Sequence, residues 1–266
     1  MKSTKNLPFL NLQRIAFISP HPDDVELCCS IIIKHLISSG IKVYYFCVTD
    51  GAPSPKILST IKCLPNNYNQ LAYKTCRRKE TITALNILGV NLAQIKFLDW
   101  PDLECYKHIP GIVRSFYNII KNADGIFCCP FEGGHPDHDI TRFALAVASD
   151  RINYSGHIFE YASYNNRGYQ IFQKDSPCSF TININSQEQK IKQQITQVFV
   201  SQKKEMEQFR TDVELFRQTG VGLTFNDYAD YEITPYYEQF AYSSSTVLGK
   251  IKEYLDSMGN HGTIKK

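Results

Sequence analysis

The sequence lacks the marks of several protein classes. It contains no uninterrupted apolar stretch of about 18 residues, so we expect no membrane-spanning helix. Residues 1–13 hold two lysines but neither an apolar core nor a small-residue cleavage site, and therefore do not resemble a signal peptide. The net charge is only +3, and no block of lysine and arginine occurs, which argues against a nucleic-acid partner.

Several catalytic and metal-binding motifs are also missing. The sequence has no CxxC, no HExxH, no GxSxG and no GxGxxG after its first predicted strand. Of its nine cysteines, four form the adjacent pairs 28–29 and 128–129, and the others are scattered. This spacing argues against a zinc site made of thiolates. It favours reduced, mostly buried thiols in a cytoplasmic protein.

Short apolar runs alternate with helical patterns along the chain. Such an alternation predicts βαβ units, a parallel sheet and an α/β fold. We place strands at residues 14–19, 42–48, 95–98, 125–129, 158–164 and 179–184. We place helices at residues 26–39, 74–88, 111–121, 139–149, 187–209 and 247–258. No internal repeat or linker divides the chain, so we expect one domain over residues 1–266, with an irregular, aromatic-rich C-terminal extension over about residues 210–258.

Two clusters of histidine and aspartate each follow a predicted strand. Residues 19–26 read Ser-Pro-His-Pro-Asp-Asp-Val-Glu, and residues 135–138 read His-Pro-Asp-His. Both clusters lie between the end of a strand and the start of a helix. Because the carboxyl ends of parallel strands share one edge, where ligands bind in open α/β sheets, we expect the two clusters to meet in space.

Two imidazoles and a carboxylate from these clusters suit a divalent metal, Zn²⁺ first. The candidate ligands are His21, Asp24 and His138. A metal with three protein ligands and an open position makes bound water acidic. Asp23 lies beside a ligand and is suited to take the proton of that water as general base. Because the same donors also suit Fe²⁺, the identity of the metal stays open.

The remaining groups of the clusters have candidate roles as well. His135, when protonated, would stabilise a tetrahedral oxyanion or protonate a leaving amine, and Asp137 would orient it. Together the groups predict metal-assisted hydrolysis of an amide or ester. The alternative is helix capping by the aspartates of the first cluster and by His138. Glu26 either faces the helix dipole or supports His21 from behind.

Three motifs in order resemble the LmbE-like, or PIG-L, zinc-dependent de-N-acetylases. Residues 20–26 (Pro-His-Pro-Asp-Asp-Val-Glu) are similar to the first signature of that family, and residues 135–138 to its second. Between them Arg77 and Glu80, followed by Ala84, Leu88 and Gly89, resemble the family's intervening helix. The similarity covers roughly residues 14–205 and includes Ser201-Gln202.

The resemblance implies a Rossmann-like, three-layer fold whose mostly parallel sheet carries helices on both faces. It also implies hydrolysis of N-acetyl groups from small molecules or glycoconjugates that contain N-acetylglucosamine. The residues carried over are His21, Asp24 and His138 as zinc ligands, Asp23 as the base, His135 as the stabiliser of the tetrahedral intermediate, Arg77 as a substrate contact, and Asp102 as a partner of sugar hydroxyls. A pairing of Arg77 with Glu80 within its helix is the alternative for that arginine.

The sequence departs from the family just after the first signature. Family members have small residues there, whereas this chain has Cys28, Ser30 and Ile31, which would shift the first helix or narrow the pocket. Two other functions stay open beside hydrolysis of an N-acetyl group. One is hydrolysis of a larger acyl group or of another amide in a specialised metabolite. The other is sugar binding without catalysis at a vestigial site. We expect a small-molecule partner, and the formation of homo-oligomers stays open.

Overall fold

A seven-stranded sheet in the order β3-β2-β1-β4-β5-β7-β6 forms the centre of the computed structural model. The structure describes residues 11–59, 69–131, 133, 135–163, 179–203, 205–220 and 244–258. Its strands are β1 (Arg14–Ser19), β2 (Lys42–Thr49), β3 (Ile95–Trp100), β4 (Gly125–Cys128), β5 (His157–Tyr161), β6 (Ser179–Asn183) and β7 (Val213–Thr219). Neighbouring strands from β3 to β5 are parallel, and β7 is antiparallel to both β5 and β6.

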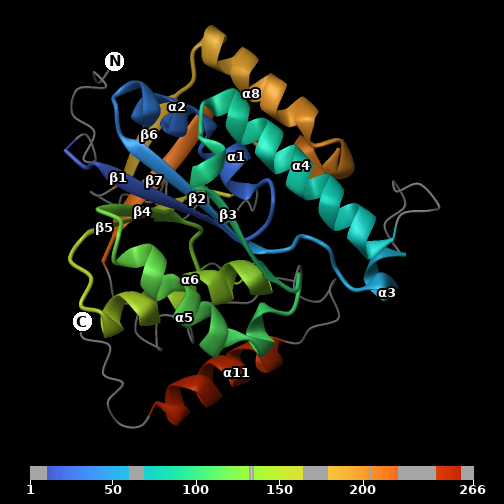
Figure 1. Ribbon diagram of the computed structural model, residues 1–266, viewed down its shortest axis with the longest axis vertical. Helices are drawn as coiled ribbons and strands as arrows, with labels where there is room; N and C mark the ends of the chain where they lie inside the picture. Colours follow the sequence, from blue (N-terminus) through green and yellow to red (C-terminus); the bar gives the residue numbers. More distant parts are fainter. Residues whose placement is uncertain are drawn as a thin grey trace.

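Helices cover both faces of the sheet, as Figure 1 shows. One face carries α1 (Asp24–Cys28), α2 (Ser30–Ser38), α4 (Gln70–Leu88) and α8 (Ser186–Val198). The other carries α5 (Ile109–Ile120) and α6 (Pro136–Arg151), with α11 (Ser244–Ser257) packed on the outer side of α5. The predicted three-layer α/β fold is therefore confirmed. None of the helices in the described ranges combines the length and apolar character that a membrane span requires.

Aromatic rings join the central strands on one face of the sheet. Phe17 of β1 stacks on Phe127 of β4 with ring centroids 4.7 Å apart, and Phe127 stacks on Phe159 of β5 at 4.8 Å. All three rings are fully buried. Each such pair contributes about 0.5–1.5 kcal/mol beyond the burial of its apolar area. The stack fixes β1 beside β4, which is the neighbourhood on which the candidate site depends.

The helix predicted for residues 26–39 is two helices, α1 and α2, which are broken at Cys29. Glu214 of β7 accepts hydrogen bonds from the backbone N–H groups of Ile31 (2.9 Å) and Ile32 (3.0 Å), at the start of α2. Lys192 of α8 donates to the carbonyl oxygen of Leu27 at 2.6 Å and pairs with Glu214 at 3.0 Å. This buried pair, the Lys192–Glu214 clamp, satisfies the backbone groups on both sides of the break.

The C-terminal part of the sequence prediction is wrong in two places. Residues 213–219, predicted to be irregular, form strand β7 between β5 and β6. Its sequence, Val-Glu-Leu-Phe-Arg-Gln-Thr, does not alternate regularly between apolar and polar residues, which is the pattern by which a half-buried strand is recognised. One of its two charged residues, Glu214, is buried. The helix predicted to reach residue 209 ends at Val198. The aromatic residues from 221 to 243 lie outside the described residues.

Three smaller predictions meet the structure more closely. The segment predicted as a loop over residues 52–70 contains the short helix α3 (Pro55–Leu58), and residues 60–68 lie outside the described part. The other predicted elements occur within a few residues of their expected bounds. None of the cysteines in the described ranges forms a disulfide, as expected for reduced thiols.

The Lys192–Glu214 clamp yields a prediction about stability. In Glu214→Ala the Lys192 ammonium stays buried without its counter-charge, so we expect the free energy of unfolding to fall by about 3–5 kcal/mol. Urea unfolding followed by circular dichroism measures this difference. The matched control is Glu253→Ala, which breaks the exposed Lys250–Glu253 pair on α11 and should cost no more than about 1 kcal/mol. Equal effects of the two changes would show that the clamp does not support the helices.

Candidate metal centre

The two predicted clusters meet at the carboxyl ends of β1 and β4. These strands are neighbours, and the strand order reverses between them, since the chain proceeds outward from β1 to β3 and then returns to β4. His21 follows β1 by two residues, and His135 is the N-cap of α6. In open α/β sheets the crevice at such a reversal is the usual ligand site. The expectation that the clusters converge is confirmed by direct contact between their histidines.

One carboxylate oxygen lies between two imidazole rings. Asp24 Oδ2 is 3.2 Å from His21 Nδ1 and 3.2 Å from His138 Nε2, and the two nitrogens are 3.3 Å apart. Ligands about 2.0–2.1 Å from a tetrahedral Zn²⁺ are separated by about 3.3–3.4 Å, which is the edge of that tetrahedron. The three side chains are buried. Their donor atoms therefore have the chemistry and the spacing of one face of a metal site.

A third imidazole, that of His135, belongs to the same cluster. Donor atoms of His21, His135 and His138 all lie within 4.8 Å of one another, which makes a three-histidine candidate metal site. The Nδ1 of His135 accepts a hydrogen bond from the backbone N–H of Asp137 at 3.2 Å. Burial and the charges of the other two histidines lower the pKa of His135 well below its usual value. His135 is therefore neutral, with its proton on Nε2, rather than protonated.

The far side of the His21 ring faces two more carboxylates. His21 Nε2 is 3.2 Å from Asp102 Oδ1 and 3.2 Å from Asp137 Oδ2. Burial lowers the pKa of His21, but hydrogen bonds with these carboxylates and with Asp24 outweigh it and raise the pKa well above its usual value. A metal-binding histidine commonly donates its second N–H to a carboxylate in this way, which fixes the ring and its tautomer.

Asp137 contacts a different histidine from the one that the sequence suggests. The sequence predicts that it orients His135, but its carboxylate lies against His21, and only its backbone N–H reaches His135. The backbone N–H groups of Leu103 and Cys105 donate to this carboxylate at 2.6 and 3.1 Å. Neither residue could be predicted from the sequence, because a backbone donor leaves no signal in the side-chain pattern.

Asp23 occupies a strained position beside the candidate ligands. Its φ of 142° is in the region that favours glycine, and its side chain makes no capping bond to α1. The Nη2 of Arg77 donates to Asp23 Oδ2 at 2.7 Å and to the carbonyl oxygen of Pro22 at 2.8 Å, while Nη1 donates to that of Gly51 at 2.9 Å. Gly51, with φ of 64°, has no room for a side chain, since a Cβ there would lie 2.6 Å from Pro22.

Burial affects the pKa of Asp23 more than its ion-pair partner Arg77 does. It raises the pKa of the Asp23 carboxyl to about 7, although the guanidinium of Arg77 opposes the rise. The neighbouring Asp24 behaves differently. Its burial is outweighed by the imidazoles of His138 and His21, which hold its pKa well below the usual range. The pKa values of these two adjacent carboxyl groups are thus shifted in opposite directions, as in sites where one acid titrates near neutral pH and the other stays charged.

Arg77 does not pair with Glu80 within its helix. The carboxylate of Glu80 instead accepts hydrogen bonds from the backbone N–H and the hydroxyl of Ser201, at 2.8 and 2.5 Å. Arg77 is 6% exposed, and its donors face Asp23 and two backbone carbonyls. Contact between Arg77 and a substrate stays a prediction from the family resemblance.

Glu26 of α1 forms a hydrogen bond with a residue of β2 rather than with His21. Its Oε1 accepts a hydrogen bond from the hydroxyl of Tyr45 on β2 at 3.1 Å, and its side chain is fully buried. Burial, helped by the charge of Asp23, raises the pKa of Glu26 to about 8. Of the two roles that the sequence left open, neither describes this contact. Glu26 is a neutral hydrogen-bonding group in the floor of the site at neutral pH.

A family model and a curated relative match this chain. The model of the PIG-L family, described as GlcNAc-PI de-N-acetylase, matches residues 16–149. The diacetylchitobiose deacetylase of Thermococcus kodakarensis is 31% identical over 157 residues, which cover 57% of this chain and 53% of that protein. The match therefore spans about half the length of the curated relative.

Solved structures share the fold of this chain. A deacetylase from the biosynthesis pathway of teicoplanin has a TM-score of 0.63 at 18% identity, covering 77% of this chain and 97% of its own. The N,N'-diacetylchitobiose deacetylase of Pyrococcus horikoshii has a TM-score of 0.59 at 22% identity, covering 90% and 92%. At this level of identity the likeness shows the fold alone.

The contacts around His21 predict a graded loss of metal affinity. We expect Asp137→Asn to weaken Zn²⁺ binding by about 10–100-fold, because it removes a carboxylate that orients a ligand. Asp24→Asn should weaken it further, since it removes a charged donor. Calorimetric titration of metal-free protein measures both losses. His157→Gln, which changes a histidine on β5 bonded to Gln218, is the matched control and should bind as the unaltered protein does. Wild-type affinity in Asp24→Asn would contradict the assignment of these atoms.

Proposed function

Since the chain belongs to the PIG-L family, whose model matches half of it, we propose that it is a metal-dependent amide hydrolase. In this proposal it removes the N-acetyl group from a small molecule or glycoconjugate that contains N-acetylglucosamine. The observation that carries the proposal is the triangle of donor atoms from His21, Asp24 and His138, with the carboxylate of Asp23 beside it. The diacetylchitobiose deacetylase relative supports an N-acetylated sugar as the substrate class.

The chemistry of the donors supports a divalent cation, with Zn²⁺ as the first candidate. His21 Nδ1, Asp24 Oδ2 and His138 Nε2 would hold it, because their mutual distances of 3.2, 3.2 and 3.3 Å fit a tetrahedral face. We favour this set over the three histidines, because the Nδ1 lone pair of His135 is engaged by a backbone N–H. A cation in this place acidifies water and polarises an amide carbonyl.

Asp23 is the proposed general base. It would take a proton from the water that attacks the carbonyl carbon, and this proton then becomes available to the departing amine. A carboxyl with a pKa near the working pH is well matched to both steps, and burial raises the pKa of Asp23 to about 7. Arg77 would act as a positioning residue, since its guanidinium fixes Asp23 in a conformation that the backbone alone disfavours.

His135 is proposed to stabilise the tetrahedral oxyanion as a neutral donor. Its Nδ1 accepts from the backbone N–H of Asp137, which places the proton of the neutral ring on Nε2, and in this proposal that N–H would donate to the carbonyl oxygen as negative charge develops there. A donor that stays neutral adds no positive charge close to the cation site. For Asp102, a contact with sugar hydroxyls remains a proposal. Its Oδ1 lies 3.2 Å from His21 Nε2, which also allows it to orient that ring.

Release of acetate from N-acetylglucosamine conjugates by the metal-loaded protein is the first test. We expect Asp23→Asn to lower kcat by about 10²–10⁴-fold, since it removes the proton acceptor without altering the size of the side chain. The matched control is Asp99→Asn, which changes a half-exposed carboxylate on β3 and should leave kcat unchanged. Full activity of Asp23→Asn would refute its role, and no turnover by metal-loaded protein would favour a vestigial site. A panel of longer N-acyl groups separates deacetylation from hydrolysis of larger acyl groups.

The pH profile tests the proposed link between Arg77 and Asp23. The base acts as a carboxylate, so kcat/KM should rise as the pH rises through the pKa of Asp23. The positive charge of Arg77 lowers that pKa, and Arg77→Met should therefore move the rise to higher pH. A bound cation lowers the pKa in both proteins, so the comparison keeps its sign. Arg78→Met, which removes the neighbouring arginine paired with Asp99, is the control. An unchanged pH profile in Arg77→Met would show that Arg77 does not influence the base, and would contradict the proposed link to Asp23.

A further inference from the structure

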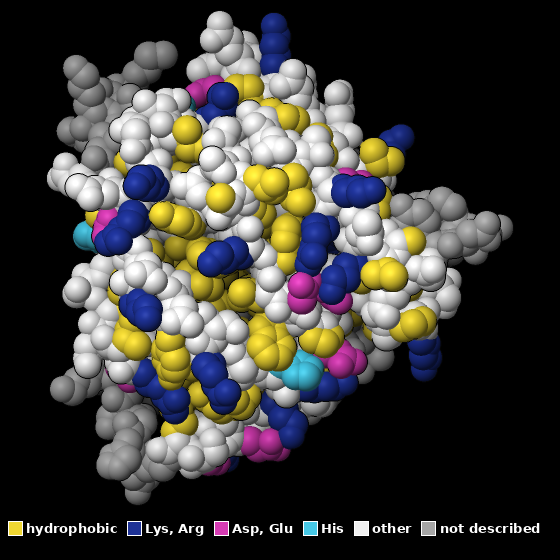
Figure 2. All heavy atoms as spheres, in the orientation of Figure 1, with side chains coloured by type: hydrophobic (Ala, Val, Ile, Leu, Met, Phe, Trp, Pro, Cys, Tyr) yellow, Lys and Arg dark blue, Asp and Glu magenta, His cyan; other side chains and the backbone are white. Residues whose placement is uncertain are grey.

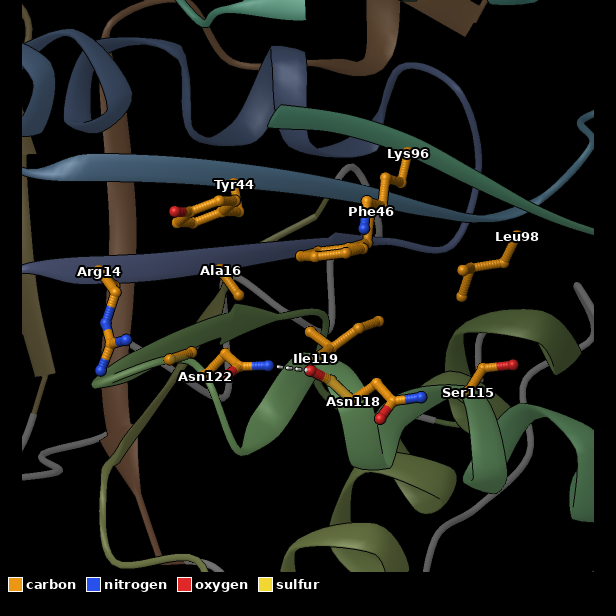
Figure 3. Close-up of a pocket in the computed structure, with 11 residues that line it drawn as sticks. Arg14, Ala16, Tyr44, Phe46, Lys96, Leu98, Ser115, Asn118, Ile119 and Asn122 are labelled. Atoms are coloured by element: carbon orange, nitrogen blue, oxygen red, sulfur yellow. Dashed lines mark hydrogen bonds between the residues drawn. The ribbon is translucent and has the colours of Figure 1, made fainter. Parts of the chain in front are cut away.

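A cavity lies between the sheet and α5, away from the candidate metal centre. Its volume is about 530 Å³, which is within the usual range of small-molecule sites. Strand β1 runs along it from Arg14 and then continues to His21, so about 20 Å of extended chain separates the two sites. Figure 3 shows the cavity with the strands above and α5 below.

The sheet wall of the cavity is apolar and partly aromatic. Ala16 of β1, Tyr44 and Phe46 of β2, and Leu98 of β3 line it. Tyr44 is the registered neighbour of Ala16, so these residues form one continuous face. In Figure 3 the two rings lie along the sheet and turn their faces to the cavity. Flat apolar surfaces of this kind accept an aromatic ring or a short acyl chain.

The cavity exists because α5 does not extend over β2 and β3. The alternate residues of β2, Val43, Tyr45 and Cys47, face the opposite helical layer and are buried there. On the α5 side, Ser115 and Asn118 form the facing wall. Figure 2, which has the orientation of Figure 1, shows hydrophobic side chains gathered in the middle of the molecular surface that faces the viewer, with Lys and Arg side chains around them.

The cavity carries positive charge, and one of its two cations, an exposed lysine, has no ion-pair partner among the described residues. Its lining includes Arg14 and Lys96 but no carboxylate. Arg14 pairs with Asp124 at 3.3 Å. Lys96 forms no ion pair with any residue in the described ranges, and its side chain extends toward Phe46 in Figure 3. Asn118 on α5 adds an amide group, and so does Asn122 just after the helix, whose Nδ2 donates to the carbonyl oxygen of Asn118 at 2.9 Å.

We propose that this cavity binds a small carboxylic acid with an apolar aryl or short acyl body. The ammonium of Lys96 would pair with one negative charge, and a carboxylate also accepts hydrogen bonds from an amide donor such as that of Asn118 on α5. The apolar body would lie against Tyr44 and Phe46. The site is distinct from the metal centre, since it shares no lining residue with it.

Calorimetric titration with 4-phenylbutyrate and octanoate tests the proposal. We expect saturable binding of both acids, and at least tenfold weaker binding of the neutral 4-phenylbutanamide and of both acids to Lys96→Met, because each change removes one charge-assisted hydrogen bond. The matched control is Lys79→Met, the same substitution at an exposed lysine of α4 on the opposite face of the sheet. It should bind the acids as the unaltered protein does.

A second variant tests the cavity itself rather than its charge. Asn118→Trp places a large side chain on the α5 wall and should abolish binding of both acids while leaving the circular dichroism spectrum unchanged. Absence of saturable binding to the unaltered protein, or equal affinity in Lys96→Met, would overturn the proposal. So would self-association that rises with protein concentration and disappears in Asn118→Trp, since a second copy of the chain would then occupy this face.

Discussion

The structure of the site depends on a buried carboxylate, that of Asp24, held between two imidazole rings. Removing an ion from water costs several kcal/mol, and a contact of opposite charge must offset this cost. The offset requires β1 and β4 to be neighbours, because His21 follows one and His138 the other. It also requires a fixed α1, which has only five residues and is too short to be stable alone. The Lys192–Glu214 clamp provides that support, so the antiparallel strand β7 contributes to the site without touching it.

The site distinguishes four acidic side chains by their surroundings rather than by their type. Asp24 stays charged because imidazoles face it, and Asp137 is surrounded by backbone N–H groups and an imidazole nitrogen. Asp23 is nearly as buried but has one cation on one side, which leaves its pKa close to neutrality. Glu26 is buried and has the neutral hydroxyl of Tyr45 as a hydrogen-bond partner, and burial raises its pKa to about 8. In the proposed function, this graded set would supply a ligand, an orienting group and a proton acceptor within one small volume.

Sequence reasoning recovers the parts of this arrangement that depend on local pattern. The clusters around His21 and His138 follow apolar strands, and parallel strands bring such positions to one edge, so their convergence can be predicted. Contacts that depend on tertiary packing leave no such signal. The Lys192–Glu214 clamp joins residues 22 positions apart, one on α8 and one on β7. The sequence of β7 does not show a clear strand pattern, so this contact could not be predicted. The role of Asp137 toward His21, and that of Arg77 toward Asp23, likewise depend on how loops fold over the sheet edge.

The uncovered part of the sheet lies beside α5. That helix buries its apolar residues, among them Ile112 and Phe116, and contacts α6, which in turn presents His138 to the metal centre. This contact with α6 accompanies the position of α5 beside the cavity, where Ser115 and Asn118 form one wall. Strand propensity accounts for Tyr44 and Phe46 at these positions. It does not account for the exposed ammonium of Lys96 beside them, which has no ion-pair partner within the described residues and on which the proposed carboxylate site depends.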